Sequence, residues 1–105
     1  MNNLADIWVR EYDDKVNDEI GLRIQNMRID RNLTGADIGA YIGVLANQVS
    51  RIETGKARCK LEHIYVLCQV LSCSADYLLF GKEEKLTFSP DEVEFVKKLY
   101  RSMQI

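Results

Sequence analysis

Four side chains near the middle of the chain have the chemistry needed to read the edges of base pairs. Asn47, Gln48 and Arg51 follow one another at helical spacing, and Ala46 directly precedes them. Asn and Gln can each form two hydrogen bonds with adenine, Arg can form two with guanine, and a small Ala allows contact with a thymine methyl group. These residues indicate a helix face suited to a DNA major groove, although a polar outer face is also ordinary for a surface helix.

Two short helices joined by a turn are predicted over residues 33–56. Thr34 is a good N-cap for the first helix, and Asp37 occupies the capping-box position three residues later. Gly43 is expected to end this helix in the left-handed conformation. The second helix should turn one apolar face inward, and that face comprises Leu45, Val49 and Ile52. A helix, a glycine-containing turn and a second helix together form a helix-turn-helix unit.

The composition fits one helical domain with a short appendage. The chain has 105 residues, of which 47 % are hydrophobic and 29 % are charged. Such a length and composition support one packed core. No apolar run reaches membrane-spanning length, and residues 1–8 lack the basic start and apolar run of a signal peptide, so we expect a cytoplasmic protein without a membrane partner. Cys59, Cys68 and Cys73 form no Cys-x-x-Cys pair, which favours reduced, buried thiols.

The sequence contains no arrangement that would build a catalytic site. It has one His, no glycine-rich phosphate loop, no metal-ligand spacing and no nucleophile motif. We therefore expect no enzyme activity, no metal, no cofactor and no small-molecule ligand.

The charge is distributed unevenly although the net charge is −2. Residues 1–19 hold six acidic and two basic side chains, a balance of −4. Residues 20–61 hold seven basic and three acidic side chains, a balance of +4. Residues 62–105 hold five basic and seven acidic side chains, a balance of −2. The positive block coincides with the two central helices, and local charge governs phosphate binding.

Helices are also expected on both sides of the central pair. Residues 3–15 are predicted to form an N-terminal helix, with an apolar stripe of Leu4, Ile7, Trp8 and Tyr12. Asn17 or Asp18 should cap the next helix, at 19–31. Its buried stripe is Ile20, Ile24 and Met27. A helix at 61–71 should bury Leu61, Ile64, Leu67, Cys68 and Leu71, with His63 at the surface or the boundary. Ser74 should cap a short helix at 75–80, which Gly81 ends.

A last helix is predicted from Pro90 to about Gln104. Ser89 is suited to the cap, Pro90 to the first position, and acidic residues follow in the first turn. Its apolar side includes Val93, Val96, Leu99, Tyr100 and Met103, with Phe95 beside them. We interpret this side as a dimer contact, to which the N-terminal helix could add; the alternative is that the helix folds back on its own domain.

From Ile20 to Gly81 the sequence resembles the phage-repressor-like (XRE/Cro-C1 type) helix-turn-helix domain. The most specific match is Ile52-Glu53-Thr54-Gly55-Lys56, directly after the predicted reading helix, followed at the right distance by Asp76-Tyr77-Leu78-Leu79-Phe80-Gly81. The resemblance implies an all-α fold: a compact five-helix bundle at 19–81. To it we add an N-terminal helical extension at 1–18 and, at 82–105, a linker with a C-terminal oligomerisation helix.

The resemblance also implies roles for individual residues. Bases would be read by Ala46, Asn47, Gln48 and Arg51. Phosphates would be bound by Thr34, Lys56 and Arg58, to which the local charge adds Lys60 and Arg23. Arg28 and Glu53 match a structural salt bridge between the first and third helices of the family domain. Three positions depart from the family: Gly35 replaces a usual Gln, Leu45 replaces a capping Ser or Thr, and Gly39 replaces a usual Ala, at a cost of about 1 kcal/mol in helix propensity.

The function implied is that of a DNA-binding transcriptional regulator. A homodimer would bind double-stranded DNA at a two-fold symmetric operator, with repression as the family default. The alternative is a protein-interaction helix-turn-helix module such as an antitoxin or an adaptor.

Overall fold

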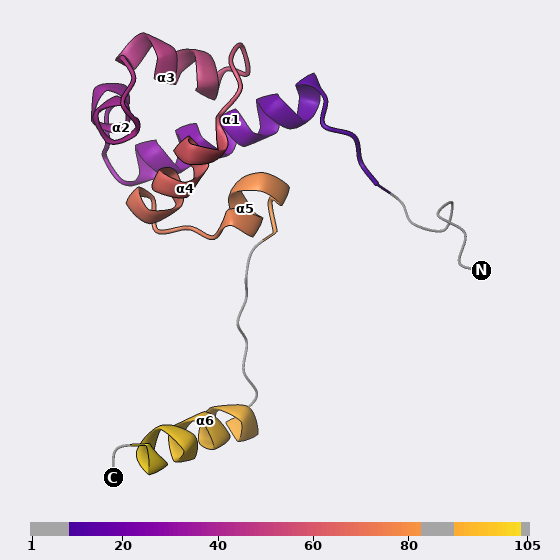
Figure 1. The fold of residues 1–105 in the computed structure, drawn as a ribbon, viewed down its shortest axis with the longest axis vertical. Helices are drawn as coiled ribbons and strands as arrows, with labels where there is room; N and C mark the ends of the chain where they lie inside the picture. The colour runs from indigo at the N-terminus through magenta and orange to yellow at the C-terminus, as the bar shows by residue number, and fades with distance from the viewer. Residues whose placement is uncertain (1–8, 83–89, 104–105) are drawn as a thin grey trace, which may run out of the picture.

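The computed structural model describes residues 9–82 and 90–103. These residues form six helices and no strand (Figure 1). The helices are α1 (Asp14–Asp30), α2 (Gly35–Ile42), α3 (Ala46–Glu53), α4 (Leu61–Val70), α5 (Ala75–Phe80) and α6 (Pro90–Ser102). The all-α prediction is confirmed, and α1 to α5 form the expected five-helix bundle. None of the helices in the described ranges is long and apolar enough to cross a membrane.

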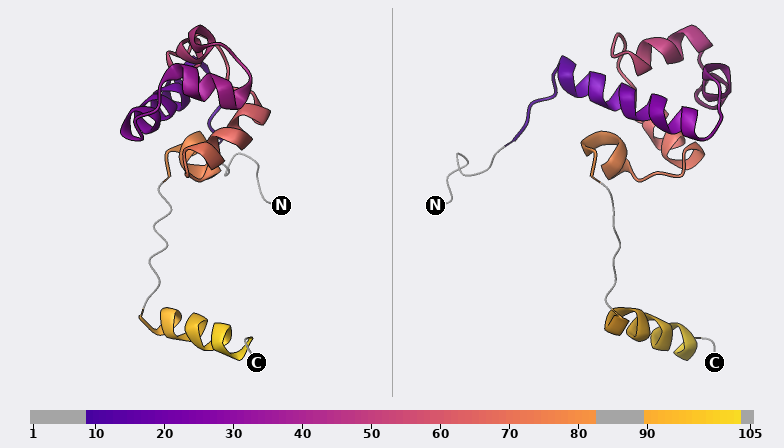
Figure 2. Two further views of the ribbon diagram at one scale, coloured as in Figure 1. Left: turned by 90° about the vertical axis from the view of Figure 1, so that its left-hand side faces the viewer. Right: turned by 180° about the vertical axis from the view of Figure 1, so that it is seen from behind.

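Helix α1 is the centre of the bundle. It packs against α3 on one side and α5 on the other, while α4 contacts both α2 and α5, an arrangement that Figure 2 shows from two further sides. The core draws on all five helices, with Ile24 from α1, Ile38 from α2, Val49 from α3, Leu67 from α4 and Leu78 from α5. No described residue of α6 belongs to this core.

The local signals of α2 and α5 are confirmed. The Thr34 hydroxyl accepts a hydrogen bond from the Asp37 amide at 3.0 Å, and the Asp37 carboxylate accepts one from the Thr34 amide at 2.8 Å. Gly43 ends α2 at a φ of 76°, as a left-handed residue should. At α5, Ser74 caps the first turn and Gly81 ends the helix at a φ of 71°. These elements are fixed by hydrogen bonds within a few residues of each other.

The prediction for the N-terminal region was wrong in part. Residues 9–13 are not helical, and α1 begins at Asp14, so the expected boundary at residue 18 falls inside α1. The cap is Asp13, whose carboxylate accepts a hydrogen bond from the Val16 amide at 2.9 Å. Asn17 does not cap the helix because it is buried within it and bonds to a distant loop. Leu4, Ile7 and Trp8 lie outside the described residues.

Two leucines that we expected in the core are exposed. Leu45 is 76 % exposed at the start of α3, where it provides no side-chain cap, and Leu61 is 80 % exposed at the start of α4. Both stand at a helix N-terminus, one turn before the packed part of the helix. In α4 the buried positions are His63 and Leu67, and the C-cap Leu71 continues this spacing of four residues. The sequence therefore placed the buried face of this first turn two residues too early.

The three cysteines are free and half-buried in the bundle. Burial raises the pKa of the Cys59 thiol to about 11 and that of Cys73 to about 11, with the neighbouring Cys68 as a second cause in both cases. Neutral, poorly nucleophilic thiols agree with the expected packing role.

Helix α6 runs from Pro90 to Ser102, close to the predicted bounds. The expected cap Ser89 and the expected last residue Gln104 lie outside the described residues.

Two glycines allow the central helices to approach each other. A Cβ at Gly21 of α1 would meet the carbonyl oxygens of Ile52 and, at 2.6 Å, of Glu53 in α3. A Cβ at Gly39 of α2 would meet the carbonyl oxygen of Val44 in the turn before α3. Gly39 therefore does more than weaken α2, because it also permits close contact within the helix-turn-helix unit.

Gly21→Ala should destabilise the fold by about 1–3 kcal/mol, because α3 must move away from α1 to admit the methyl group. Urea denaturation measures this loss. Gly35→Ala is the matched control: its Cβ would have the Ala46 carbonyl oxygen as nearest neighbour at 3.8 Å, so the change should stay within about 0.5 kcal/mol. Equal stability of the two variants would show that α1 and α3 are not held this closely.

Candidate nucleic-acid interface

The outer face of α3 carries the four predicted base-reading residues. Ala46, Asn47 and Arg51 are exposed and Gln48 is half-buried, whereas Val49 and Ile52 are buried against the core. The inner residues fix the rotation of the helix, so the polar side chains must point outward. The structure therefore presents these four residues together on one accessible helix.

The loop after α3 brings three predicted phosphate contacts next to that helix. The amide of Lys56 donates to the carbonyl oxygen of Arg51 at 2.8 Å, and the amide of Ala57 donates to the same oxygen at 3.1 Å. These bonds fold residues 54–60 back against the end of α3. The side chains of Lys56, Arg58 and Lys60 are all exposed on this loop.

The N-terminus of α2 lies against the first part of α3. Gly35 lies close to α3. A Cβ at this position would lie 3.8 Å from the carbonyl oxygen of Ala46 and 3.9 Å from Cγ1 of Val49. Thr34 precedes it and is exposed, with its hydroxyl oxygen already accepting the capping bond. The hydrogen bond from the Thr34 amide holds the pKa of the Asp37 carboxyl below its usual value, with the bond to the Thr34 side chain as a second cause. Asp37 thus stays ionised as a cap over the pH range in which DNA binding would be measured.

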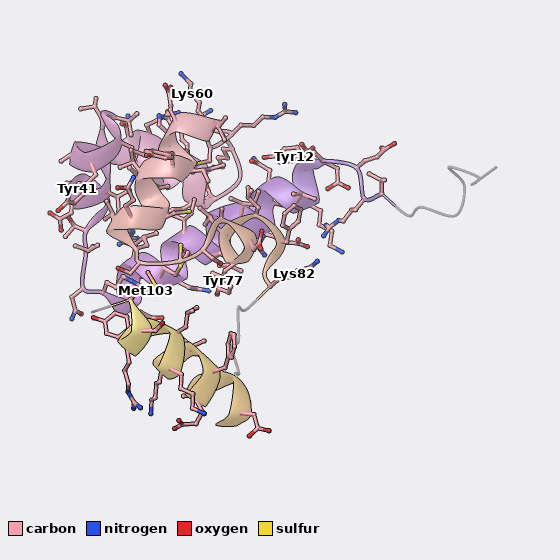
Figure 3. The ribbon with its side chains drawn as sticks, turned by 60° about the horizontal axis from the view of Figure 1, so that its bottom comes forward. Tyr12, Tyr41, Lys60, Tyr77, Lys82 and Met103 are labelled. Atoms are coloured by element: carbon pink, nitrogen blue, oxygen red, sulfur yellow. The ribbon has the colours of Figure 1, made fainter. Side chains whose placement is uncertain are left out.

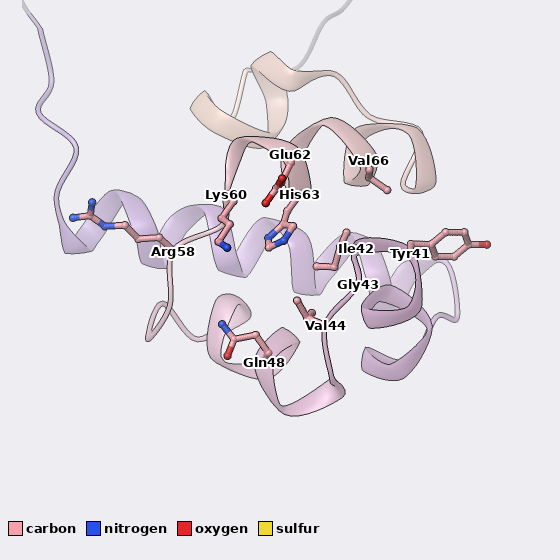
Figure 4. A pocket seen from close by; sticks show the side chains of 10 residues that line it. All are labelled: Tyr41, Ile42, Gly43, Val44, Gln48, Arg58, Lys60, Glu62, His63 and Val66. Carbon is pink, nitrogen blue, oxygen red and sulfur yellow. The ribbon is translucent and has the colours of Figure 1, made fainter.

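A hollow of about 550 Å³ opens between the α2–α3 turn and the start of α4 (Figure 4). Gln48, Arg58, Lys60 and His63 contribute to its lining. In Figure 4 the side chains of Lys60 and Gln48 approach each other across the opening. The lining is mixed, because Ile42, Val44 and Val66 are apolar and the Glu62 carboxylate stands in the first turn of α4 beside the two cations.

His63, which lines this hollow, is more buried than the sequence analysis predicted. It is 8 % exposed rather than at the surface, and its Nδ1 has no hydrogen-bond partner among the described residues. His63 precedes the buried Leu67 by four residues and Leu71 by eight, and this helical spacing could have predicted that it is buried.

Arg23 lies apart from the other predicted phosphate contacts. Its guanidinium donates to the carbonyl oxygens of Leu78 at 2.9 Å and Leu79 at 3.0 Å. These acceptors are in the last turn of α5, where unpaired carbonyl groups attract a cation. The structure therefore gives Arg23 a role in holding α5 to α1 rather than a place beside α3.

The expected ion pair between Arg28 and Glu53 is present. Arg28 Nε donates to Glu53 Oε2 at 2.7 Å, and a second guanidinium nitrogen donates to Oε1 at 3.0 Å. The third nitrogen donates to the carbonyl oxygen of Leu33 at 3.0 Å. One guanidinium thus connects α1, the entry to α2 and the end of α3. The bond to Glu53 raises the pKa of Arg28.

Comparisons with known proteins agree with this geometry. Residues 23–79 match the Cro/C1-type helix-turn-helix DNA-binding domain, and the chain belongs to this family. The match includes α2, α3, α4 and most of α5. No curated protein sequence matches the chain.

Solved structures of regulators share the fold. The P22 c2 repressor, crystallised with a synthetic operator, is 32 % identical with a TM-score of 0.56, over 60 % of this chain and 96 % of that chain. The clp gene regulator ClgR from C. glutamicum is 18 % identical with a TM-score of 0.57, over 70 % of this chain and 96 % of that chain. SinR in complex with SinI is 23 % identical with a TM-score of 0.53, over 79 % of this chain and 80 % of that chain.

The fold and the family define the class of protein. It is a DNA-binding transcriptional regulator of the helix-turn-helix type, and the family is one of regulators rather than enzymes.

Arg28→Ala should destabilise the fold by about 3–5 kcal/mol, because it leaves the Glu53 carboxylate, 5 % exposed, without its partner. Chemical denaturation measures the loss. The double variant Arg28→Met with Glu53→Leu removes both charges and should recover most of the stability. A double variant that is no more stable than Arg28→Ala would mean that the unpaired carboxylate is not the cause.

Proposed function

We propose that this regulator is a repressor that binds a two-fold symmetric operator as a homodimer, with α3 in the major groove. The observation that carries the proposal is the outward face of α3, where Asn47 and Arg51 are exposed beside a loop with three exposed lysine and arginine side chains. The P22 c2 repressor, which is crystallised on an operator, supports the same use of the fold.

In this proposal the residues divide into two groups. Arg51 reads guanine, Asn47 and Gln48 read adenine, and Ala46 contacts a thymine methyl group. Thr34, Lys56, Arg58 and Lys60 hold the DNA backbone and fix the register, with affinity that falls as salt rises. Arg23 is not part of this group because its guanidinium is bonded to α5.

Helix α6 is the proposed dimer interface, joined by residues 82–89 to a DNA-binding unit that ends at Gly81. Val96, Leu99, Tyr100 and Met103 are exposed, and their spacing of three, four and seven residues places them on one stripe. Val93 precedes them on the same stripe and is half-buried. A helix with such a stripe is stabilised by burying it against another element.

The charges of α6 favour an antiparallel pair of identical helices. Asp91 and Glu94 lie in its first half, and Lys97, Lys98 and Arg101 lie in its second half. In an antiparallel pair the acidic half of each helix meets the basic half of the other. Such a contact is two-fold symmetric, as an operator of two half-sites about 34 Å apart requires.

A protein-interaction module, such as an antitoxin or an adaptor, is the second candidate function. The exposed apolar stripe of α6 favours it, because a different protein could cover the same residues. A regulator that is monomeric at micromolar concentration and is recovered with one stoichiometric partner would support this function over the homodimer.

Arg51→Ala should abolish or relax one base preference in each half-site, since a bidentate contact with guanine contributes about 1–3 kcal/mol of discrimination. Selection from random-sequence DNA, followed by sequencing, compares the variant with the wild type. Lys82→Ala is a control that removes one charge beyond α5 and should leave the selected site unchanged. A wild-type protein that enriches no symmetric site at low salt would refute the proposed function.

Leu99→Asp should convert the dimer to monomers, because it places a carboxylate in the centre of the apolar stripe. Sedimentation velocity measures the oligomeric state, and affinity for a full operator should fall at least about tenfold, with little change for a single half-site. Ser102→Asp, which adds the same charge on the same helix outside the stripe, should remain dimeric. An unchanged dimer in Leu99→Asp would place the interface elsewhere.

A further inference from the structure

The loop that carries Lys56 and Arg58 contacts α3 on one side. On the other side it is held by a segment of the chain that the family match does not include. Tyr12, Asn17 and Asp18 all precede residue 23, where that match begins. They belong to the segment before α1 and to its first turns, and Figure 3 shows Tyr12 at this end of the helix.

Asn17 bonds directly to the backbone of the loop. Its Nδ2 donates to the carbonyl oxygen of Gly55 at 2.7 Å and approaches that of Ala57 at 3.4 Å. Its Oδ1 accepts a hydrogen bond from the Tyr12 hydroxyl at 2.9 Å. The orientation of the amide is fixed, because carbonyl oxygens only accept hydrogen bonds. Asn17 itself is buried, whereas Tyr12 is exposed, so these bonds are partly shielded from water.

Gly55 brings the loop close enough for these bonds. Its φ is 77°, and a Cβ at this position would collide with the Asp18 carboxylate and lie 3.2 Å from the Asp18 Cα. The loop backbone therefore rests on α1 at this point. On its other side the same loop is bonded to the end of α3 through the amides of Lys56 and Ala57. Residues 55–57 are consequently held between two helices.

Tyr12 also holds the Arg58 side chain. The guanidinium carbon of Arg58 lies 5.4 Å from the centroid of the Tyr12 ring, which is a cation–π distance. This contact does not neutralise the guanidinium, so the charge of Arg58 remains available for a phosphate. The segment that carries Tyr12 makes a further contact with α1, an exposed ion pair between Arg10 and Glu19 at 3.1 Å, which adds little stability.

We propose that Tyr12 and Asn17 are positioning residues for DNA-backbone binding: they fix the loop at 55–58 so that Arg58, and with it Lys56, is presented to phosphates in a set orientation. The inference rests on the proposed function. It assigns to residues outside the family match a part in affinity, although neither of them contacts the DNA in this proposal.

The central test is a pair of double-mutant cycles on operator binding. Tyr12→Ala alone should weaken operator binding about two- to fivefold for each half-site, the range of one exposed cation–π contact. Combined with Arg58→Ala, Tyr12→Ala should add little further loss, since both remove the same contact. Combined with Arg51→Ala, the two losses should multiply. If the affinity loss of the Tyr12→Ala, Arg58→Ala double variant equals the product of the two single losses, the proposal is overturned.

The salt dependence separates positioning from general stability. If Arg58 loses its phosphate, the slope of log affinity against log salt should become shallower by about 0.9 for each half-site in Tyr12→Ala. Tyr12→Phe keeps the ring over Arg58 and should keep the wild-type slope. A wild-type slope in Tyr12→Ala, or an equal change in Tyr12→Phe, would contradict the role of the ring.

Hydrogen exchange of the free protein tests the loop without DNA. Asn17→Ala and Tyr12→Ala should speed exchange of the Lys56 and Ala57 amides at least about threefold, while amides in the middle of α4 keep their wild-type rates. Unchanged loop rates would overturn the positioning role of both residues. Wild-type protein that binds no operator would refute the proposed function, and this measurement would still decide whether the contacts order the loop.

Discussion

The bidentate ion pair between Arg28 and Glu53 is the interaction on which the half of the bundle that carries α2 and α3 depends. It joins α1 to the last residue of α3, and the remaining guanidinium nitrogen binds the Leu33 carbonyl at the entry to α2. Gly21 and Gly39 allow the backbones to come close enough for this arrangement. The rotation of α3, and thus which of its side chains face outward, follows from contacts made on its buried side.

The parts of the fold that sequence reasoning predicted well are those fixed by local chemistry. The capping box of Thr34 with Asp37, the left-handed Gly43 and the Ser74 cap each involve residues a few positions apart. The start of α1 was misjudged because the sequence prediction assigned the cap to Asn17 or Asp18, four or five residues too late. Asp13 caps the helix, whereas Asn17 is drawn into it by carbonyl groups almost forty positions later in the sequence. No local pattern carries that information.

The candidate site was predictable to a similar extent. The inward Val49 and Ile52 were sufficient to identify the outward Asn47 and Arg51. Periodicity was less informative at the ends of helices, where Leu45 and Leu61 match the apolar pattern yet lie beyond the packed region. The charge of Arg23 could be read from the sequence but its acceptors could not, since the α5 carbonyl groups that bind it come from a different part of the chain.

A chain with a negative net charge presents a basic surface around α3, because in the described structure several arginines elsewhere are bound to carboxylates or carbonyl groups and the cations around α3 form no ion pair. Arg28 is paired with Glu53, Arg10 with Glu19, and Arg23 and Arg31 are bonded to backbone carbonyl groups. Within the described ranges, no carboxylate forms an ion pair with the cations around α3, which are Arg51, Lys56, Arg58 and Lys60. The net charge counts all of these residues equally, whereas a phosphate responds to those that remain accessible and held in place. Tyr12 and Asn17 matter for this reason, because they order the loop without neutralising its charge.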